Sequence, residues 1–154
     1  MRLYLVQHGE AKDKSEDPDR PLTEKGRNDV TRVGELLAKT MLQVRAIWHS
    51  GKTRAMETAR ILSVYVEAAE GTIEQSDLGP TDDVEPVCET LETAGTDVMI
   101  VGHLPFLDRL ASLLVADDDE AESIAFQKGG VLCLQREDDN WSVAWMITPD
   151  ILPR

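Results

Sequence analysis

Short apolar runs that are typical of buried strands alternate with amphipathic helical patterns along most of the chain. Residues 2–7, 44–48 and 98–101 are apolar runs of strand length, and each is followed by polar or glycine residues. Runs of this kind form strands that are covered on both faces of a sheet. The pattern therefore predicts three buried strands.

Between these runs, apolar residues recur at the three- and four-residue spacing of one helical face. In the first such helix, for example, Val30, Val33, Leu36, Leu37 and Met41 share a face. Thr23, Ser50 and Thr81 are expected to cap three of the helices, and Pro105 suits the first turn of a fourth. The predicted helices cover residues 23–42, 50–66, 81–94 and 105–114.

The end of the chain has a different pattern. Residues 131–136 and 141–147 read as two strands joined by a short turn, which predicts an antiparallel hairpin. Residues 10–22 and the acidic run 117–122 are expected to be solvated loops. We therefore predict one domain over residues 1–154, with a three-layer α/β/α fold, a mainly parallel central sheet and a C-terminal antiparallel hairpin.

Composition narrows the choice of partners and compartment. The net charge of −13 argues against nucleic acid or an anionic membrane as partner, but a small site on an acidic protein can still be positive. Cys88 and Cys133 form neither a CxxC pair nor a zinc-ligand spacing, and a buried free thiol is the expected state of Cys133. The chain begins directly with a strand-like run and has no apolar stretch of membrane-spanning length. These features predict a cytoplasmic protein.

The three histidines of the chain stand at the ends of the predicted buried strands. His8, His49 and His103 each end or follow one of them. Ligands of open parallel sheets bind beyond the carboxyl ends of the strands, so these imidazoles are expected at one edge. Arg54 and the N-termini of the helices after Ser50 and Leu104 are expected at the same edge. Arginine and helix N-termini favour an anion such as phosphate.

Four motifs resemble those of the histidine phosphatase superfamily, and of its SixA-type phosphohistidine phosphatases in particular. Val6-Gln7-His8-Gly9-Glu10 resembles the Arg-His-Gly signature, and Arg20-Pro21-Leu22-Thr23 with Gly26 resembles a SixA-type segment. Ser50 with Arg54-Ala55 and Thr58-Ala59 resembles the second arginine motif, and Gly102-His103-Leu104-Pro105 resembles the second histidine motif. The motifs occur in the family's order and cover nearly the whole chain.

The resemblance implies a role for each matched residue. His8 would be the nucleophile that takes the phosphoryl group, and Arg54 with a protonated His103 would hold its oxygens. Arg20 would add a donor from the loop, and Gln7, Gly9 and Ser50 would belong to the substrate-binding residues. Water would then hydrolyse the phosphohistidine on His8, with neither a metal nor a cofactor. The implied substrate is a histidine-phosphorylated protein or a small phosphorylated molecule.

Two features bear on the substrate. The family has arginine where this chain has Gln7, which keeps a donor but loses the charge and the bidentate fork. No motif marks a general acid, although Glu10, Asp82 and Asp83 are candidates. A phosphoramidate needs less help with its leaving group than an ester does, so the missing acid favours phosphohistidine. The alternatives are a binding module with little turnover and a small-molecule phosphoester phosphatase.

Other interpretations of the same residues are weaker. Gly51-Lys52-Thr53 resembles the end of a P-loop, but Ala46 stands where that motif needs glycine. The three histidines could bind zinc, but no two of them have the i, i+4 spacing of a helix, and Arg54 would repel a cation. Arg54 could instead pair with Glu57, and Arg20 with nearby acidic residues. His49 is expected to be a structural neighbour of the site.

Overall fold

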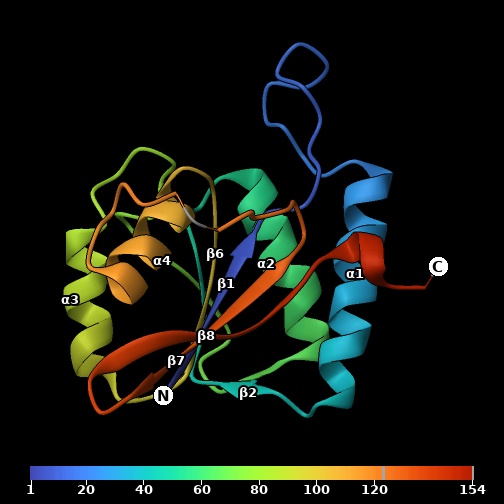
Figure 1. Cartoon of the computed structure of the whole chain (residues 1–154). Helices are drawn as coiled ribbons and strands as arrows, with labels where there is room; N and C mark the ends of the chain where they lie inside the picture. The colour runs from blue at the N-terminus through green and yellow to red at the C-terminus, as the bar shows by residue number, and fades with distance from the viewer. Residues whose placement is uncertain (123, 154) are drawn as a thin grey trace.

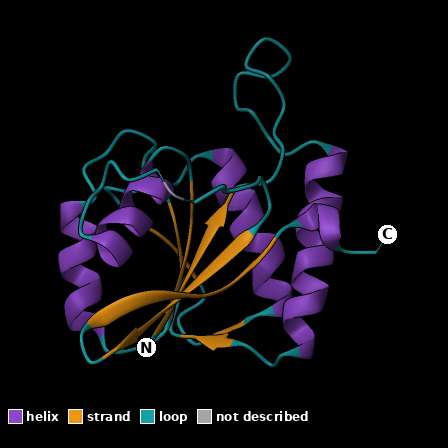
Figure 2. Cartoon of the chain, in the orientation of Figure 1, coloured by secondary structure: helices purple, strands orange, loops and turns teal. Residues whose placement is uncertain are grey.

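The computed structural model describes residues 1–122 and 124–153, and a six-stranded sheet forms its centre (Figures 1 and 2). The first four strands in spatial order are parallel, β7 is antiparallel to β1, and β8 is antiparallel to β7. This arrangement confirms the predicted mainly parallel sheet with its C-terminal hairpin. The order of the strands is β5 (Thr72–Glu74), β3 (Ile47–His49), β6 (Val98–Gly102), β1 (Arg2–Gln7), β7 (Val131–Glu137) and β8 (Asn140–Ile147).

Helices cover both faces of this sheet, as the apolar runs predicted. Alternate residues of β1 point to opposite faces, with Leu3 and Leu5 in one buried cluster and Tyr4 and Val6 in the other. One face carries α1 (Glu24–Lys39) and α2 (Thr53–Tyr65), and the other carries α3 (Glu85–Ala94) and α4 (Phe106–Ala116). No helix in the described part of the chain is both long and apolar enough to span a membrane.

The predicted strand over residues 44–48 is wrong in its extent, because the chain divides it between two sheets. β2 (Gln43–Val44) pairs with β4 (Glu67–Ala68) in a separate two-stranded sheet, and β3 begins only at Ile47. Val44 of β2 and Ile47 and Trp48 of β3 are all buried and apolar, so hydrophobicity alone does not reveal the break between the two strands.

Three predicted helix boundaries also need correction. α1 begins as expected, with the Thr23 hydroxyl accepting from the Gly26 amide, but it ends at Lys39, and Met41 is exposed beyond it with a positive φ. α2 begins after Lys52 and receives no cap from Ser50. α3 begins after Val84, because a proline in its first turn sets its start, and not at Thr81.

The carboxyl ends of β3, β6 and β1 lie along one edge of the sheet, and the loop of residues 10–22 projects there as a separate lobe (Figure 1). The base of this loop is closed by a bridge between Ala11 and Leu22 and by a hydrogen bond from the Lys12 amide to the Pro21 carbonyl. The fold therefore brings the loop beside the strand ends that carry the histidines.

Candidate functional site

His8 and His103 lie together at the carboxyl edge of the sheet. β1 and β6 pair in parallel with Gln7 opposite Gly102, so the residue that follows each strand reaches the same position. The His8 amide donates to the Gly102 carbonyl at 3.0 Å, and the two imidazole centroids are 5.1 Å apart. This proximity confirms what the parallel pairing of the two strands predicts for their ends.

One ring nitrogen of His8 is occupied and the other is available. Nδ1 lies 2.7 Å from the Gly9 carbonyl oxygen. A carbonyl can only accept, so Nδ1 carries the proton and Nε2 keeps a lone pair. Burial, together with the charges of Arg54, Lys128 and Arg20, lowers the pKa of His8 to about 4, although its bond to Gly9 acts in the opposite direction. His8 is therefore neutral at pH 7 and its Nε2 can act as a nucleophile.

The turn that carries His8 is held by a buried hydroxyl on α2. The Gly9 amide donates to Thr58 Oγ1 at 3.0 Å, and that hydroxyl donates to the Arg54 carbonyl at 2.8 Å. Thr58 is fully buried. A Cβ on Gly9 would lie only 2.9 Å from Val30 Cγ2, so glycine is needed for this close approach to α1.

His103 is bound through one nitrogen to Ser50. Ser50 Oγ lies 2.6 Å from Nε2, whereas Nδ1 is buried without a partner. Burial and the nearby His8, Arg54, Lys52 and Arg20 lower the pKa of His103 to about 3. The imidazole is therefore neutral in the ligand-free protein, and the protonated His103 of the family mechanism would need an anion beside it.

Arg54 and Arg20 supply positive charge to the same edge. Burial and the Arg20 guanidinium lower the pKa of Arg54 below its usual value. The alternative pairing of Arg54 with Glu57 is not formed, because Glu57 accepts from the Leu22 amide and from Arg27. Within the described residues, Arg20 forms no ion pair and donates its Nε–H to the Lys12 carbonyl.

His49 stands apart from this pair. Its Nδ1 accepts from the Gly51 amide at 3.1 Å, so its ring serves the loop between β3 and α2. Among the described residues, no group of three or more His, Cys, Asp or Glu side chains is arranged to hold a metal ion. The observed position agrees with the structural role expected for His49.

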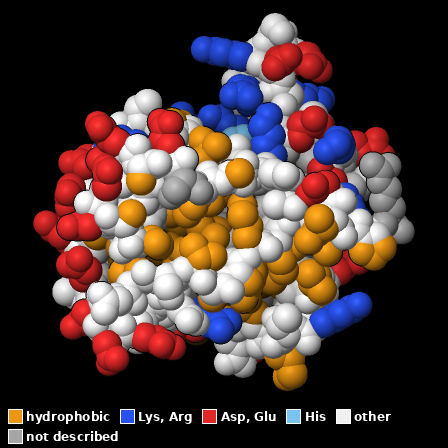
Figure 3. Space-filling view, viewed as in Figure 1, with side chains coloured by type: hydrophobic (Ala, Val, Ile, Leu, Met, Phe, Trp, Pro, Cys, Tyr) orange, Lys and Arg blue, Asp and Glu red, His pale blue; other side chains and the backbone are white. Residues whose placement is uncertain are grey.

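Buried polar atoms without partners concentrate at this edge. In the described part of the chain four such side-chain atoms occur, and three of them are Gln7 Oε1, Arg54 Nε and His103 Nδ1. Buried polar groups are nearly always hydrogen-bonded, so a cluster of incomplete ones indicates a ligand. Figure 3 shows histidine surface ringed by Lys and Arg side chains at the base of the projecting loop, whereas acidic side chains gather over the side that carries α3. The arrangement suits an anion.

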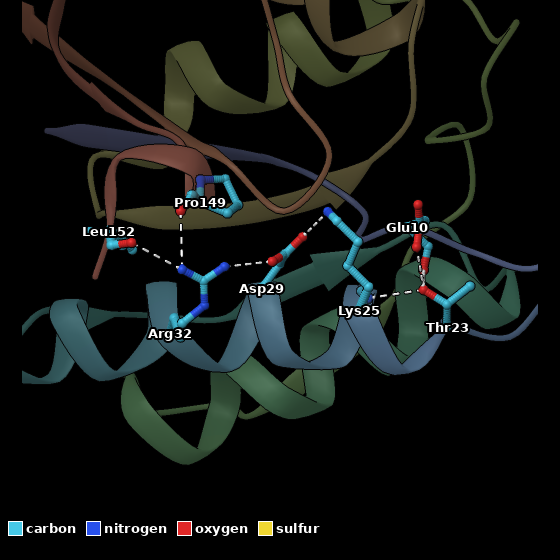
Figure 4. Close-up of polar contacts among 8 residues, drawn as sticks. Glu10, Thr23, Lys25, Asp29, Arg32, Pro149 and Leu152 are labelled. Atoms are coloured by element: carbon cyan, nitrogen blue, oxygen red, sulfur yellow. Dashed lines mark hydrogen bonds and ion pairs between the residues drawn. The ribbon is translucent and has the colours of Figure 1, made fainter. Parts of the chain in front are cut away.

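All three candidate acids take part in loop or helix-start hydrogen bonds. Glu10 accepts from the Thr23 hydroxyl at 2.6 Å, beside the start of α1 (Figure 4). Asp82 Oδ2 accepts from the Gly79 amide, and Asp83 Oδ1 from the Glu85 amide. Asp82 also lines a cleft of about 550 Å³ that Ser50 and Lys52 border. Asp82 therefore shares a cleft with Ser50, a residue of the predicted site.

Sequence comparison assigns the family. The profile of the histidine phosphatase superfamily (branch 1) matches residues 3–76. An uncharacterized protein of the cyanobacterium Picosynechococcus sp. is 31% identical over 142 residues, which cover 88% of this chain and 85% of that protein. The chain belongs to the histidine phosphatase superfamily.

Solved histidine phosphatase structures share this fold over nearly the whole chain. The protein histidine phosphatase SixA, solved with tungstate, superposes with a TM-score of 0.86 at 21% identity, covering 97% of this chain and 98% of that one. The α-ribazole phosphatase of Shigella flexneri gives 0.74 at 16% identity, covering 97% of each chain. At these identities the similarity establishes the fold, and the two relatives act on different substrates.

Two basic residues near the histidines had no assigned role in the sequence. Lys52 ends the loop before α2 and contributes to the low pKa of His103, whereas the sequence suggests only a resemblance of this residue to the end of a P-loop. Lys128 lies just before β7 and contributes to the low pKa of His8. Lys128 lies outside the four motifs. The pairing of β7 with β1 and the hydrogen bonds from the Gly129 amide to the Gln7 and His8 carbonyls bring its backbone close to His8.

Proposed function

We propose that this histidine phosphatase hydrolyses phosphohistidine on a protein and that His8 is its nucleophile. The observation that carries the proposal is the state of His8. Its Nδ1–H is bonded to the Gly9 carbonyl, which leaves a neutral Nε2 at an edge that holds unpartnered buried polar atoms. Arg54 and His103 are the proposed ligands of the phosphoryl oxygens, with Arg20, Gln7, Gly9 and Ser50 as the remaining substrate-binding residues.

The proposed reaction has two displacements. Nε2 of His8 attacks phosphorus and the bond from phosphorus to the substrate nitrogen breaks, so the substrate imidazole leaves with its electron pair and a proton. Water then attacks phosphorus on His8, releases inorganic phosphate and restores the imidazole. Arg54 offers a fixed charge to the phosphoryl oxygens in both steps.

His103 contributes through its free nitrogen. With Nε2 bound to Ser50, Nδ1 is the atom left to face a ligand. A phosphoryl dianion favours the charged imidazole, so its arrival raises the pKa of His103 from its low ligand-free value. Gln7 can take part as well, because rotation of its carboxamide exchanges the unpartnered oxygen for an NH2 donor.

The choice of phosphohistidine rests on the leaving group. Glu10, Asp82 and Asp83 already accept hydrogen bonds that shape their loops, and no family motif marks any of them as the general acid. A protonated phosphohistidine nitrogen leaves without a dedicated acid, whereas an ester oxygen needs one. Asp82 gives the ester alternative its one specific support, since it lines the cleft beside Ser50.

Phosphate release from a histidine-phosphorylated protein and from an aryl phosphate tests this proposal. We expect the native chain to prefer phosphohistidine, His8→Ala to lose turnover, and His49→Gln, the matched histidine control, to keep it. Preference for the aryl phosphate, lost in Asp82→Asn, would instead identify an ester phosphatase. Phosphate binding without release from either substrate would identify a binding module and overturn the catalytic proposal.

A further inference from the structure

The loop before β7 crosses directly over the peptide that joins Gln7 to His8. The Gly129 amide lies 2.9 Å from the Gln7 carbonyl and 3.2 Å from the His8 carbonyl, so it donates to both. Gly129 is buried and has a φ of +79°, a conformation that glycine adopts without strain. These contacts fix the backbone of the preceding residue, Lys128, beside the nucleophile.

Lys128 is an exposed cation that the fold does not use. It forms no hydrogen bond or ion pair with the part of the chain that the structure describes. Lys128 lines a surface groove with two carboxylates, the buried Asp29 and the exposed Asp150, and Asp29 is already paired with Lys25 and Arg32. Its charge does reach His8, whose pKa it helps to lower. A phosphate that enters the site therefore lies within reach of the electric field of this ammonium group.

The polar residue beneath this loop is uncharged. Gln7 lies at the end of β1, below the Gly129 contacts, and brings an amide rather than a cation to the site. A phosphoryl group held from that side by an amide alone would receive only neutral hydrogen bonds, which are about half as strong as charged ones. A flexible ammonium group anchored one residue from Gly129 can supply the missing charge.

We propose that Lys128 is a phosphate-binding residue of this site and provides the positive charge that Gln7 does not. The proposal rests on the function proposed above, since it assigns a further ligand to the same phosphoryl group. Lysine is a compact point charge on a flexible stem, so it can follow the phosphoryl oxygens between the two displacements. Arg54 and Lys128 would then hold the group from different elements, α2 and the loop before β7.

Inorganic phosphate is the probe, because its binding is measured without turnover. We expect Lys128→Gln to raise the dissociation constant for phosphate about five- to tenfold, which is the effect of losing a partly exposed charged hydrogen bond. Lys128→Arg should stay within about twofold of the native chain, since it keeps the charge. Lys39→Gln, at the far end of α1, is the matched control for net charge and should have no effect.

A charge placed at position 7 makes the test specific. In the Gln7→Arg background, Lys128→Gln should raise the dissociation constant for phosphate less than twofold. The double-mutant cycle should therefore show coupling between the two positions. The His8 ring signals in NMR should also titrate at higher pH in Lys128→Gln, an effect that a purely structural role would not produce.

The two proposals fail in different ways. Phosphate binding to Lys128→Gln within twofold of native, with His8→Ala still inactive, would overturn the role of Lys128 and leave the phosphatase intact. No turnover in the native chain, with weakened phosphate binding in Lys128→Gln, would support Lys128 and overturn the phosphatase.

Discussion

The molecule contains two clusters of buried polar side chains, one around Asp29 on α1 and one around His8 and His103 at the sheet edge. The Asp29 carboxylate accepts from Lys25 and Arg32, and Arg32 also donates to the carbonyls of Pro149 and Leu152 beside the short helix η1 (Pro149–Ile151) (Figure 4). At the sheet edge, by contrast, three buried side-chain atoms have no partner among the described residues: Gln7 Oε1, Arg54 Nε and His103 Nδ1.

This difference separates stability from function. A buried carboxylate with complete hydrogen bonds stabilises the folded chain, and here its partner Arg32 joins the C-terminal segment to α1. Unpartnered buried groups cost free energy, and they persist where a ligand completes them. Changes in the first cluster should therefore reduce stability and spare activity, and changes in the second should do the reverse.

Substituting one arginine in each cluster is the most direct test of this difference between the two clusters. Arg54→Gln should lower kcat/KM about 100-fold, because a fixed donor to the transition state is lost. Its free energy of unfolding should not fall, since the buried Nε has no partner to lose. Arg32→Gln should keep kcat/KM within about twofold and lose about 2 kcal/mol of stability, because Asp29 and two carbonyls lose a donor.

Steady-state kinetics and urea unfolding of the two variants check this prediction together. A destabilised Arg54→Gln with unchanged kcat/KM would mean that the sheet edge is also a structural cluster. Arg27→Gln, which removes the exposed pair with Glu57, serves as a control and should change both quantities little.

Thr58 is expected to contribute both to stability and to activity, so it tests how clearly the two roles can be separated. Thr58→Val leaves the Gly9 amide without its acceptor, so we expect a loss of about 1–2 kcal/mol in stability and about a tenfold fall in kcat at nearly constant KM. Thr58→Ser keeps the hydroxyl and should recover most of kcat. If the valine variant lost stability but kept its kcat, the hydroxyl would not position His8.

Most of the histidine placement could be predicted from the chain. Residues that follow neighbouring parallel strands meet at one edge, which brings His8 beside His103 whatever the details of the helices. Arg54 could be placed because the first turn of the helix after β3 returns to that edge. These inferences use local patterns and one rule of sheet topology.

The remaining features depend on contacts between distant segments. The break between Val44 and Ile47 arises because Arg45 bonds to the Asp97 carbonyl while its neighbours join different sheets. Lys128 comes close to His8 through the antiparallel pairing of β7 with β1 and the Gly129 hydrogen bonds to the Gln7 and His8 carbonyls, which a hairpin pattern does not specify. The incomplete hydrogen bonds of Gln7 and His103 likewise follow from packing, because a sequence does not state which polar atoms are buried.

The two clusters should also affect the stability of the fold at different pH. The pKa values of His8 and His103 lie at about 4 and about 3, below the ordinary value of 6.5, mainly because burial disfavours the charged rings. Below pH 6.5 these histidines therefore bind protons in the unfolded chain but not in the folded chain. The free energy of unfolding should begin to fall as the pH drops below 6.5. Burial opposes ionisation of Asp29, but the bonds from Lys25 and Arg32 lower its pKa below 3.8, so its contribution persists until the pH is lower still.

Phosphate should change the pH dependence that comes from the histidines and leave that of Asp29 unaltered. A bound anion favours protonated His103, so added phosphate should raise the pKa of His103 and reduce the loss of stability between pH 6.5 and 4. NMR titration of the histidine rings and urea unfolding across this pH range, with and without phosphate, measure both. His103→Gln should flatten the pH dependence in the same window, whereas Asp29→Asn should alter it only below about pH 4. Titration of His103 near pH 6.5 in the ligand-free protein would show that its low pKa, and with it the distinction between the two clusters, is wrong.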